Sequence, residues 1–143
     1  MKRQPECVCI NLRRAARAMT QLYDDALARA GISVTQFSLL AAVERHQPAP
    51  IGALAADLDL DRTTLARNLA LLARDGLITT AAGEDRRVSE TRLTAKGRRS
   101  LAAARPLWRK AQADVRARFG AGQVDRLRAI AAAASAVAAA VKR

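Results

Sequence analysis

Aromatic residues are scarce in this chain. Phe, Trp and Tyr make up 3% of its 143 residues, although hydrophobic residues as a whole make up 50%. Small apolar side chains bury little area each, so a core must come from close packing of helices, and association with a second chain would add buried surface. Ala, Leu and Arg dominate the composition, which favours helix. The length suits one domain of ordinary size.

Histidine and cysteine are nearly absent as well. His46 is the only histidine, so no motif pairs a nucleophile with a histidine base, and we expect neither an enzyme nor a resident metal or cofactor. The two cysteines, Cys7 and Cys9, form a C-x-C pair that is too close for an ordinary structural disulfide. A reducing cytosol would keep both as thiols.

Long apolar runs are missing, which argues against a transmembrane helix. The N-terminus is basic but no apolar stretch follows it, so we expect no signal peptide, no membrane partner and a cytoplasmic location.

Acidic residues number 13 against 25 Lys and Arg, which gives a formal net charge of +12. Residues 1–60 carry net +1, residues 61–99 net +4 and residues 100–143 net +7. A basic chain of this kind is expected to bind a polyanion. The alternative explanation of the charge is a solvated, arginine-rich surface that binds no such partner.

The stretch from Leu58 to Thr94 predicts a helix followed by a β-hairpin. Asp61 is suited to cap the helix, and Gly76 to end it in a left-handed conformation. Leucines at helical spacing predict the buried side, and small or polar residues with two arginines occupy the other. The buried side comprises Leu65, Leu69 and Leu72, and the other comprises Arg62, Thr63, Ala66, Arg67 and Ala70.

Two β-rich segments, Leu77–Thr80 and Val88–Leu93, flank the turn-like and basic segment Ala82–Arg87. A helix shaped for a major groove, followed by a hairpin with arginines at its tip, is the layout of a winged helix-turn-helix.

Apolar spacing and capping residues predict the other helices. Ser33 is suited to cap a helix that ends near His46, and Pro48 and Pro50 force an extended link after it. Pro106 predicts a kink or a break in the long helix that Thr94 caps. The expected helices cover residues 8–30, 33–46, 51–58, 95–118 and 123–141.

We therefore expect a mainly α fold with a small β-hairpin wing. Residues 1–143 would form a single domain, in which residues 33–94 are the winged helix-turn-helix and residues 8–30 and 95–143 supply dimerisation helices. The last helix has a seam of Ala and Val and is marginal without tertiary packing. The alternative is that these helices fold back on their own domain.

Three segments in this order resemble the MarR family of bacterial transcriptional regulators. They are DRTTLARNLALLARDGLI from Asp61 to Ile78, DRR from Asp85 to Arg87 and LTAKG from Leu93 to Gly97. The resemblance covers essentially the whole chain. It implies a dimeric winged helix that represses nearby genes until a small molecule or an oxidant changes the dimer.

The resemblance also implies which side chains meet DNA. They are Arg62, Thr63, Thr64, Arg67 and Asn68 on the recognition helix and Arg86 and Arg87 on the wing. Arginine can bridge two acceptors of guanine, asparagine can pair with adenine, and an arginine is attracted into a narrow A·T minor groove. Asp85 is expected to orient the wing arginine. Capping of the helix is a nearly equal alternative for Thr64.

The first helix resembles that of the organic-peroxide sensors of the MarR family through the spacing of Cys9, Arg17, Thr20 and Tyr23. In that resemblance Cys9 is the peroxide-reactive thiol and Tyr23 a hydrogen-bond partner of the cysteine. Other tyrosine positions of the sensors hold Arg13 and Val34 here, and a further aromatic position holds Phe37.

Local chemistry allows three roles for the two thiols. A thiolate is favoured in the first turn of a helix and near a cation such as Arg13, and Cys7 could attack a sulfenic acid at Cys9, although a disulfide between two chains has better geometry. The first role is therefore redox sensing. The second is plain packing at a helix start, and the third is binding of a soft metal or an arsenical.

These patterns lead to one main hypothesis. The chain is expected to be a homodimeric, DNA-binding transcriptional repressor that binds a roughly palindromic double-stranded operator and responds to an oxidant or a small-molecule effector. The alternatives are a thiol-based regulator that responds to metals or arsenicals, an enzyme, and a winged-helix module that binds proteins without DNA. The cores of protein–protein interfaces are usually depleted in charged residues, so the basic helix and wing argue against the protein-binding module.

Overall fold

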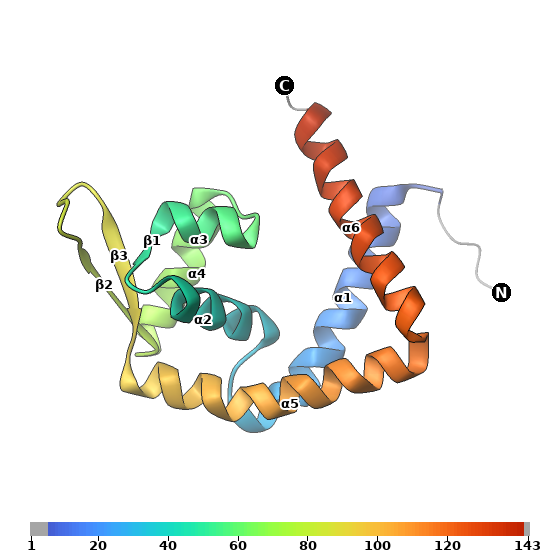
Figure 1. Ribbon diagram of the computed structural model, residues 1–143, viewed down its shortest axis with the longest axis horizontal. Helices are drawn as coiled ribbons and strands as arrows, with labels where there is room; N and C mark the ends of the chain where they lie inside the picture. The colour runs from blue at the N-terminus through green and yellow to red at the C-terminus, as the bar shows by residue number, and fades with distance from the viewer. Residues whose placement is uncertain (1–5, 142–143) are drawn as a thin grey trace. The chain divides into compact units, whose positions relative to one another are not determined.

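The computed structural model describes residues 6–141 and is mainly helical with one small sheet, as predicted (Figure 1). The elements are α1 (Val8–Leu27), the short 3-10 helix η1 (Ala28–Ala30), α2 (Val34–His46), β1 (Ala49–Pro50), α3 (Ile51–Leu58), α4 (Arg62–Arg74), β2 (Ile78–Ala82), β3 (Ser89–Leu93), α5 (Ala95–Phe119) and α6 (Ala121–Val141). The chain forms two compact units, one up to Trp108 and one from Arg109 onward.

Capping groups fix where the first helices end and begin. Gly31 has a φ of 69°, a left-handed conformation that ends the α1–η1 segment. Ser33 starts α2 with a complete capping box. Its hydroxyl accepts from the backbone N–H of Gln36 at 3.2 Å, and the Gln36 side chain accepts from the N–H of Ser33 at 2.9 Å. The predicted cap at Ser33 is therefore confirmed.

The sheet has three antiparallel strands in the order β1-β3-β2, whereas the sequence predicted only the two strands of the hairpin. In β1, Ala49 pairs with Thr91, and Pro50 pairs with Glu90. The predicted extended link is correct, but its pairing was missed because two residues are too few to show an alternating pattern. A proline is tolerated there because β1 is an edge strand.

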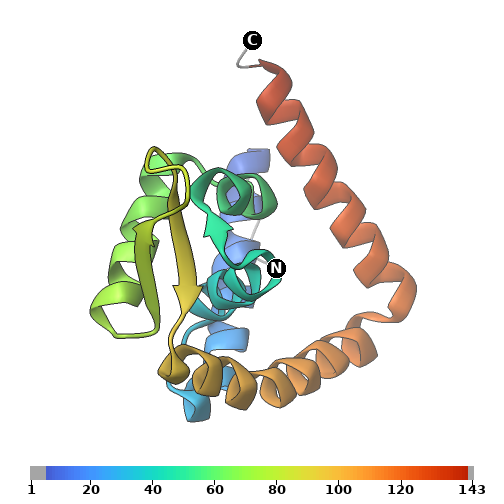
Figure 2. The same ribbon diagram turned by 60° about the vertical axis from the view of Figure 1, so that its left-hand side comes forward.

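One hydrophobic core holds the first unit together. Figure 2 shows the sheet lying against the helices that supply this core. Its largest fully buried side chains come from five helices and the wing: Leu27, Leu40, Leu54, Leu65, Leu72, Leu101, Val43 and Thr91. The Thr91 hydroxyl lies 3.4 Å from that of Thr80 on the neighbouring strand, which gives this buried polar group a partner.

Polar and aromatic contacts add to the core around α2. Arg45 of α2 pairs with Asp57 of α3 at 2.6 Å, and Arg105 of α5 pairs with Glu44 of α2. The rings of Phe37 and Trp108 stack with centroids 5.5 Å apart. These contacts tie α2 to α3 and to the first half of α5.

Of the two outcomes predicted at Pro106, a kink or a break, the break does not occur, because α5 continues through this residue to Phe119. Pro106 lacks the N–H that would bond to the carbonyl of Ala102. Both residues are exposed, so water can reach that carbonyl. Leu101 and Ala104, on the other side of the helix, are buried in the core and hold α5 in place.

The second unit contains the end of α5 and the whole of α6. Gly120, with a φ of 82°, separates the two helices, and α6 begins at Ala121 rather than at the predicted Gln123. Val115 and Val124 are buried. Most apolar side chains of α6 remain exposed, with exposed fractions of 58% for Ile130 and 64% for Val137.

Within residues 6–141, no single helix has the length and apolar character needed to cross a membrane. The two consecutive helical segments Val8–Ala30 and Val34–His46, which are bent relative to each other, are long and apolar enough only when they are taken together, by length and composition alone.

Candidate nucleic-acid interface

Helices α3 and α4 form the predicted helix-turn-helix. The turn between them uses Asp59, which has a φ of 50° and donates its N–H to the carbonyl of Ala56. Asp61 then caps α4, because its carboxylate accepts from the backbone N–H of Thr64 at 2.9 Å and from the Thr64 hydroxyl at 2.7 Å. These bonds lower the pKa of Asp61 below its usual value, so the cap is charged at neutral pH.

The buried side of α4 determines which residues it presents outward. Leu65, Leu69 and Leu72 enter the core as predicted. Residues on the opposite side lie at the surface: Arg62, Thr63, Ala66, Arg67, Ala70 and Arg74 are all exposed. The outer surface of α4 therefore carries the guanidinium groups of Arg67 and Arg74 between small side chains, and Arg62 is exposed at the first position of the helix.

The structure separates the five recognition-helix residues into two groups. Arg62, Thr63 and Arg67 are exposed, whereas Thr64 and Asn68 are half-buried. The hydroxyl proton of Thr64 is already donated to Asp61, which supports the capping role of Thr64. Asn68 lies on the helix beside the core-facing leucines of α4, and part of its surface is covered.

Within the wing turn, the carboxylate of Asp85 orients Arg87. The carboxylate of Asp85 accepts from the backbone N–H of Arg87 at 3.1 Å and lies 3.7 Å from its guanidinium. The turn closes with a hydrogen bond of 2.8 Å from the N–H of Gly83 to the carbonyl of Val88. Arg87 is 93% exposed and Arg86 is exposed beside it, so both are available to a partner.

The LTAKG segment joins the wing, α4 and α5, and the sequence predicted only its capping of α5. Thr94 caps α5 as predicted by accepting from the N–H of Gly97 at 2.9 Å, and it also donates to the carbonyl of Gly76 at 2.7 Å. Lys96 donates to the carbonyl of Asp75 at 2.7 Å. We call Thr94, Lys96 and Gly97 the wing clasp.

The thiols are placed at the start of α1. Cys7 is the N-cap residue, Cys9 lies in the first turn, and both are exposed. Tyr23 is on the same continuous helix, 14 residues further on, which corresponds to about 21 Å along the axis. Cys9 and Tyr23 therefore do not meet within one chain. Burial raises the pKa of Tyr23, so its hydroxyl is protonated at neutral pH.

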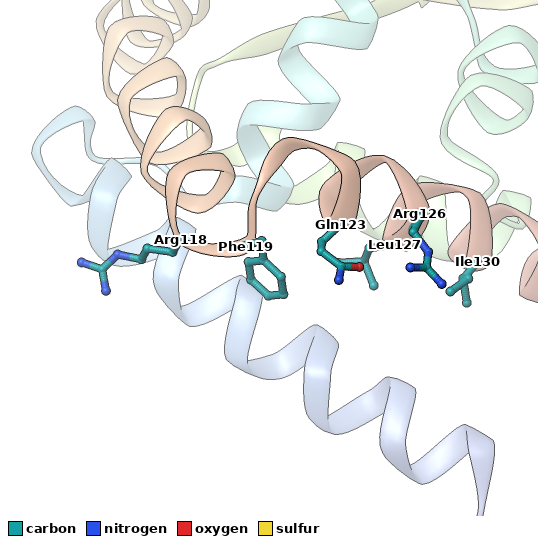
Figure 3. A pocket seen from close by; sticks show the side chains of 6 residues that line it. All are labelled: Arg118, Phe119, Gln123, Arg126, Leu127 and Ile130. Atoms are coloured by element: carbon teal, nitrogen blue, oxygen red, sulfur yellow. The ribbon is translucent and has the colours of Figure 1, made fainter.

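Among the cavities of residues 6–141, two that lie away from the helix-turn-helix surface are considered for a ligand. One, of about 420 Å³, lies between α2 and α5 and is lined by Val34, Phe37, Ser38, Ala41, Arg45, Arg105 and Trp108. The other is an open groove of about 600 Å³ at the bend between α5 and α6. Figure 3 shows its lining side chains projecting to one side: Arg118, Phe119, Gln123, Arg126, Leu127 and Ile130. Residues 6–141 contain no cluster of His, Cys, Asp and Glu that could hold a metal ion.

The helix-turn-helix, the exposed arginines and the wing define a winged-helix DNA-binding protein, and comparisons with known proteins identify its family. The model of the MarR family matches residues 30–88. A crystal structure of the M. tuberculosis transcriptional regulator MosR in complex with DNA is 43% identical, with a TM-score of 0.87 over 96% of this chain and 100% of that chain.

A second crystal structure of M. tuberculosis MosR is 42% identical, with a TM-score of 0.78 over 94% of this chain and 97% of that chain. The transcriptional repressor CouR, bound to a 23-mer DNA duplex, is 24% identical with a TM-score of 0.77 over 91% and 93%, a likeness of fold alone. No curated protein sequence matches the chain. The chain belongs to the MarR family and is a DNA-binding transcriptional regulator.

Proposed function

We propose that the chain acts in the cytoplasm as a homodimeric repressor that binds a roughly palindromic DNA operator. The observation that carries this proposal is the pairing of an exposed, arginine-bearing outer surface on α4 with an exposed wing arginine oriented by Asp85. A recognition helix of this kind enters a major groove, and an arginine on a wing suits the narrow minor groove beside it.

The exposed residues take different roles in this proposal. Arg67 lies on the outer surface of α4 and contacts a base edge, with Thr63 one turn before it. Arg62, at the first position of α4, extends toward α3, because a Cβ atom added to Gly52 would lie 4.0 Å from its guanidinium. Arg86 and Arg87 engage the minor groove and the phosphates.

Dimerisation is supported by apolar surface that one chain leaves uncovered. Exposed apolar side chains occur on α1 and on α6: Val8, Ile10, Leu12 and Leu22, and Leu127, Ile130, Val137 and Val141. A second copy would cover such helices and place two recognition helices in major grooves about 34–36 Å apart. The 15.3 kDa chain should then sediment at twice its mass at micromolar concentration.

The test is selection of binding sequences from random duplex DNA, followed by affinity measurements with single variants. Arg67→Ala should lose about 1–3 kcal/mol and relax the preference at one base pair of each half-site. Arg87→Ala should weaken binding with little change in the major-groove preference. Arg128→Ala removes the same charge from an exposed position of α6 and serves as the matched control. Selection that returns no preferred sequence would refute operator binding.

We propose the cavity beside Trp108 as the site of a small-molecule effector. An aromatic ring can stack against the exposed part of the Phe37–Trp108 pair, and the guanidiniums of Arg45 and Arg105 at its rim are already paired with carboxylates. A neutral or weakly polar aromatic compound fits these charges. A compound that releases wild-type protein from DNA should fail to release Trp108→Ala, while Trp108→Phe should keep part of the response.

The exposed thiols support a second candidate for the effector, an oxidant that reacts at Cys9. A new polar group or a bridge between two chains at the start of α1 would alter the proposed dimer. A coupling of about 1–3 kcal/mol would change DNA affinity by roughly 5–150-fold. Peroxide titration should release the wild type but leave Cys9→Ser bound, and Cys7→Ser should also stay bound if a disulfide is required. A wild type that keeps its affinity with oxidised thiols would refute this candidate.

A further inference from the structure

The outermost line of α4 contains one side chain that is wholly apolar. Spacings of four, three and four residues place Thr63, Arg67, Ala70 and Arg74 along one line, opposite the buried leucines. All four residues are exposed. Ala70 stands between the two guanidinium groups and presents only a methyl group to whatever α4 contacts.

The side chain expected to recognise adenine lies off this line. Asn68 is half-buried, and it is three residues after Leu65 and four before Leu72, both of which are in the core. A bidentate bond to adenine requires the whole amide to face the base edge. The hydroxyl of Thr64 is likewise committed to Asp61. The outermost line of α4 therefore presents neither of these polar groups to an A·T pair.

We propose that α4 reads an A·T pair through the C5-methyl group of thymine, which contacts the side chain of Ala70. This inference rests on the proposed operator binding and names the feature of DNA that the site selects. Among the four bases, only thymine presents a methyl group in the major groove. Arg67 and Ala70 are separated by about 4.5 Å along the helix, comparable to the 3.4 Å between base pairs, so they contact neighbouring pairs.

The size of Ala70 is part of the mechanism. A methyl side chain lets the helix backbone approach the floor of the groove, while Arg67 reaches a base from the same line. A longer side chain at this position would hold α4 away from the DNA. Contact between the methyl groups of Ala70 and thymine removes apolar surface from water. Each of the other three bases would leave a gap beside Ala70 or bury a polar group without a partner, so it would bind less tightly.

The experiment replaces single thymines of the selected operator with deoxyuridine, which lacks the methyl group and keeps the base pairing. Wild-type protein should bind about fourfold more weakly when one thymine of a half-site is replaced, and about 15-fold more weakly when the equivalent thymines of both half-sites are replaced. Replacement of the other thymines should change the affinity less than twofold.

Two alanine variants connect the effect to one side chain. Ala70→Gly should bind the thymine and deoxyuridine operators with equal affinity. Ala73→Gly is the matched control, because it removes the same methyl group from an exposed position of α4 that directly follows the buried Leu72. It should keep the full fourfold discrimination. Each variant is compared on two DNAs, so a loss of helix stability cancels in the ratio.

Several outcomes would overturn the inference without affecting operator binding. One is a wild type that binds every deoxyuridine operator as tightly as its parent, and another is an Ala70→Gly variant that still discriminates fourfold. A third is an Asn68→Ala variant that loses its preference at an A·T pair, since the amide would then be the reading group. If selection returns no preferred sequence at all, both the inference and the proposed function fail.

Discussion

Gly97→Ala tests the wing clasp most sharply. A Cβ atom at residue 97 would lie 2.0 Å from the carbonyl oxygen of Leu77 and 3.0 Å from its carbonyl carbon. Ordinary van der Waals contacts of a Cβ atom are 3.4–4 Å, and both partners here are backbone atoms, so α5 or the start of the wing must move by more than about 1 Å. The same Leu77 carbonyl accepts the N–H of Thr94 at 3.1 Å, so this movement also strains the clasp.

The cost follows from these contacts. Overpacking against backbone costs up to about 3 kcal/mol, and loss of the hydrogen bond from Thr94 to Leu77 about 1 kcal/mol. Alanine is favoured over glycine in a helix by about 1 kcal/mol, which offsets part of this cost. The free energy of unfolding should therefore fall by about 3 kcal/mol. Because the clasp positions the wing, DNA affinity should fall as well.

Urea unfolding at fixed protein concentration measures this change, since the stability of a dimer depends on concentration. Gly122→Ala is the matched control, because a Cβ atom there meets nothing within 4 Å in α6. It should leave the stability unchanged or raise it by up to about 1 kcal/mol. If Gly97→Ala is as stable as the wild type, the close approach of α5 to Leu77 does not exist and the clasp is wrongly described.

Removal of one helix cap, one ion pair or one helix tests other parts of the structure. Ser33→Ala should lower the free energy of unfolding by about 1 kcal/mol by removing the cap of α2, whereas Ser38→Ala, at an exposed position within the same helix, should not. The hydrogen bond from Arg45 holds the pKa of Asp57 below its ordinary value, so the pair should stabilise the fold by up to about 1 kcal/mol at neutral pH. The stability difference between wild type and Asp57→Asn should shrink as the pH falls from the ordinary pKa of an aspartate through the lowered pKa of Asp57. Truncation after Gly122 removes most of α6 and should abolish the dimer in sedimentation.

Local sequence signals predicted the helix-turn-helix well because each is a direct interaction of nearby residues. Asp61 caps α4 through Thr64, and Gly76 adopts the positive φ expected of a helix end. The periodic leucines of α4 sufficed to identify its buried side. The wing strands also followed from composition, since β2 and β3 pair directly across a short turn.

Features that depend on contacts between residues far apart in the chain could not be predicted from the sequence. Strand β1 forms because Ala49 pairs with Thr91, a residue far away in the sequence. Helix α5 continues through Pro106 because residues next to this proline in the helix are buried in the core. The clasp likewise depends on the approach of Gly97 to Leu77, 20 residues earlier in the chain. For the site, the sequence could group Asn68 with Arg67, but only packing reveals that Asn68 is half-buried.

We propose that operator binding depends on the arginines of α4 and the wing rather than on the basic charge of the whole chain. The decisive measurement compares two triple variants on the selected operator at one salt concentration. One variant replaces Arg62, Arg67 and Arg87 with alanine; the other replaces three exposed arginines of the second unit, Arg109, Arg126 and Arg128.

Both variants lose the same charge, so a difference between them reports the position of the arginines. The first should bind at least about 100-fold more weakly than the wild type, and the second should stay within about fivefold while remaining a dimer in sedimentation. Equal losses in the two variants, or retained affinity in the first, would contradict docking through α4 and the wing.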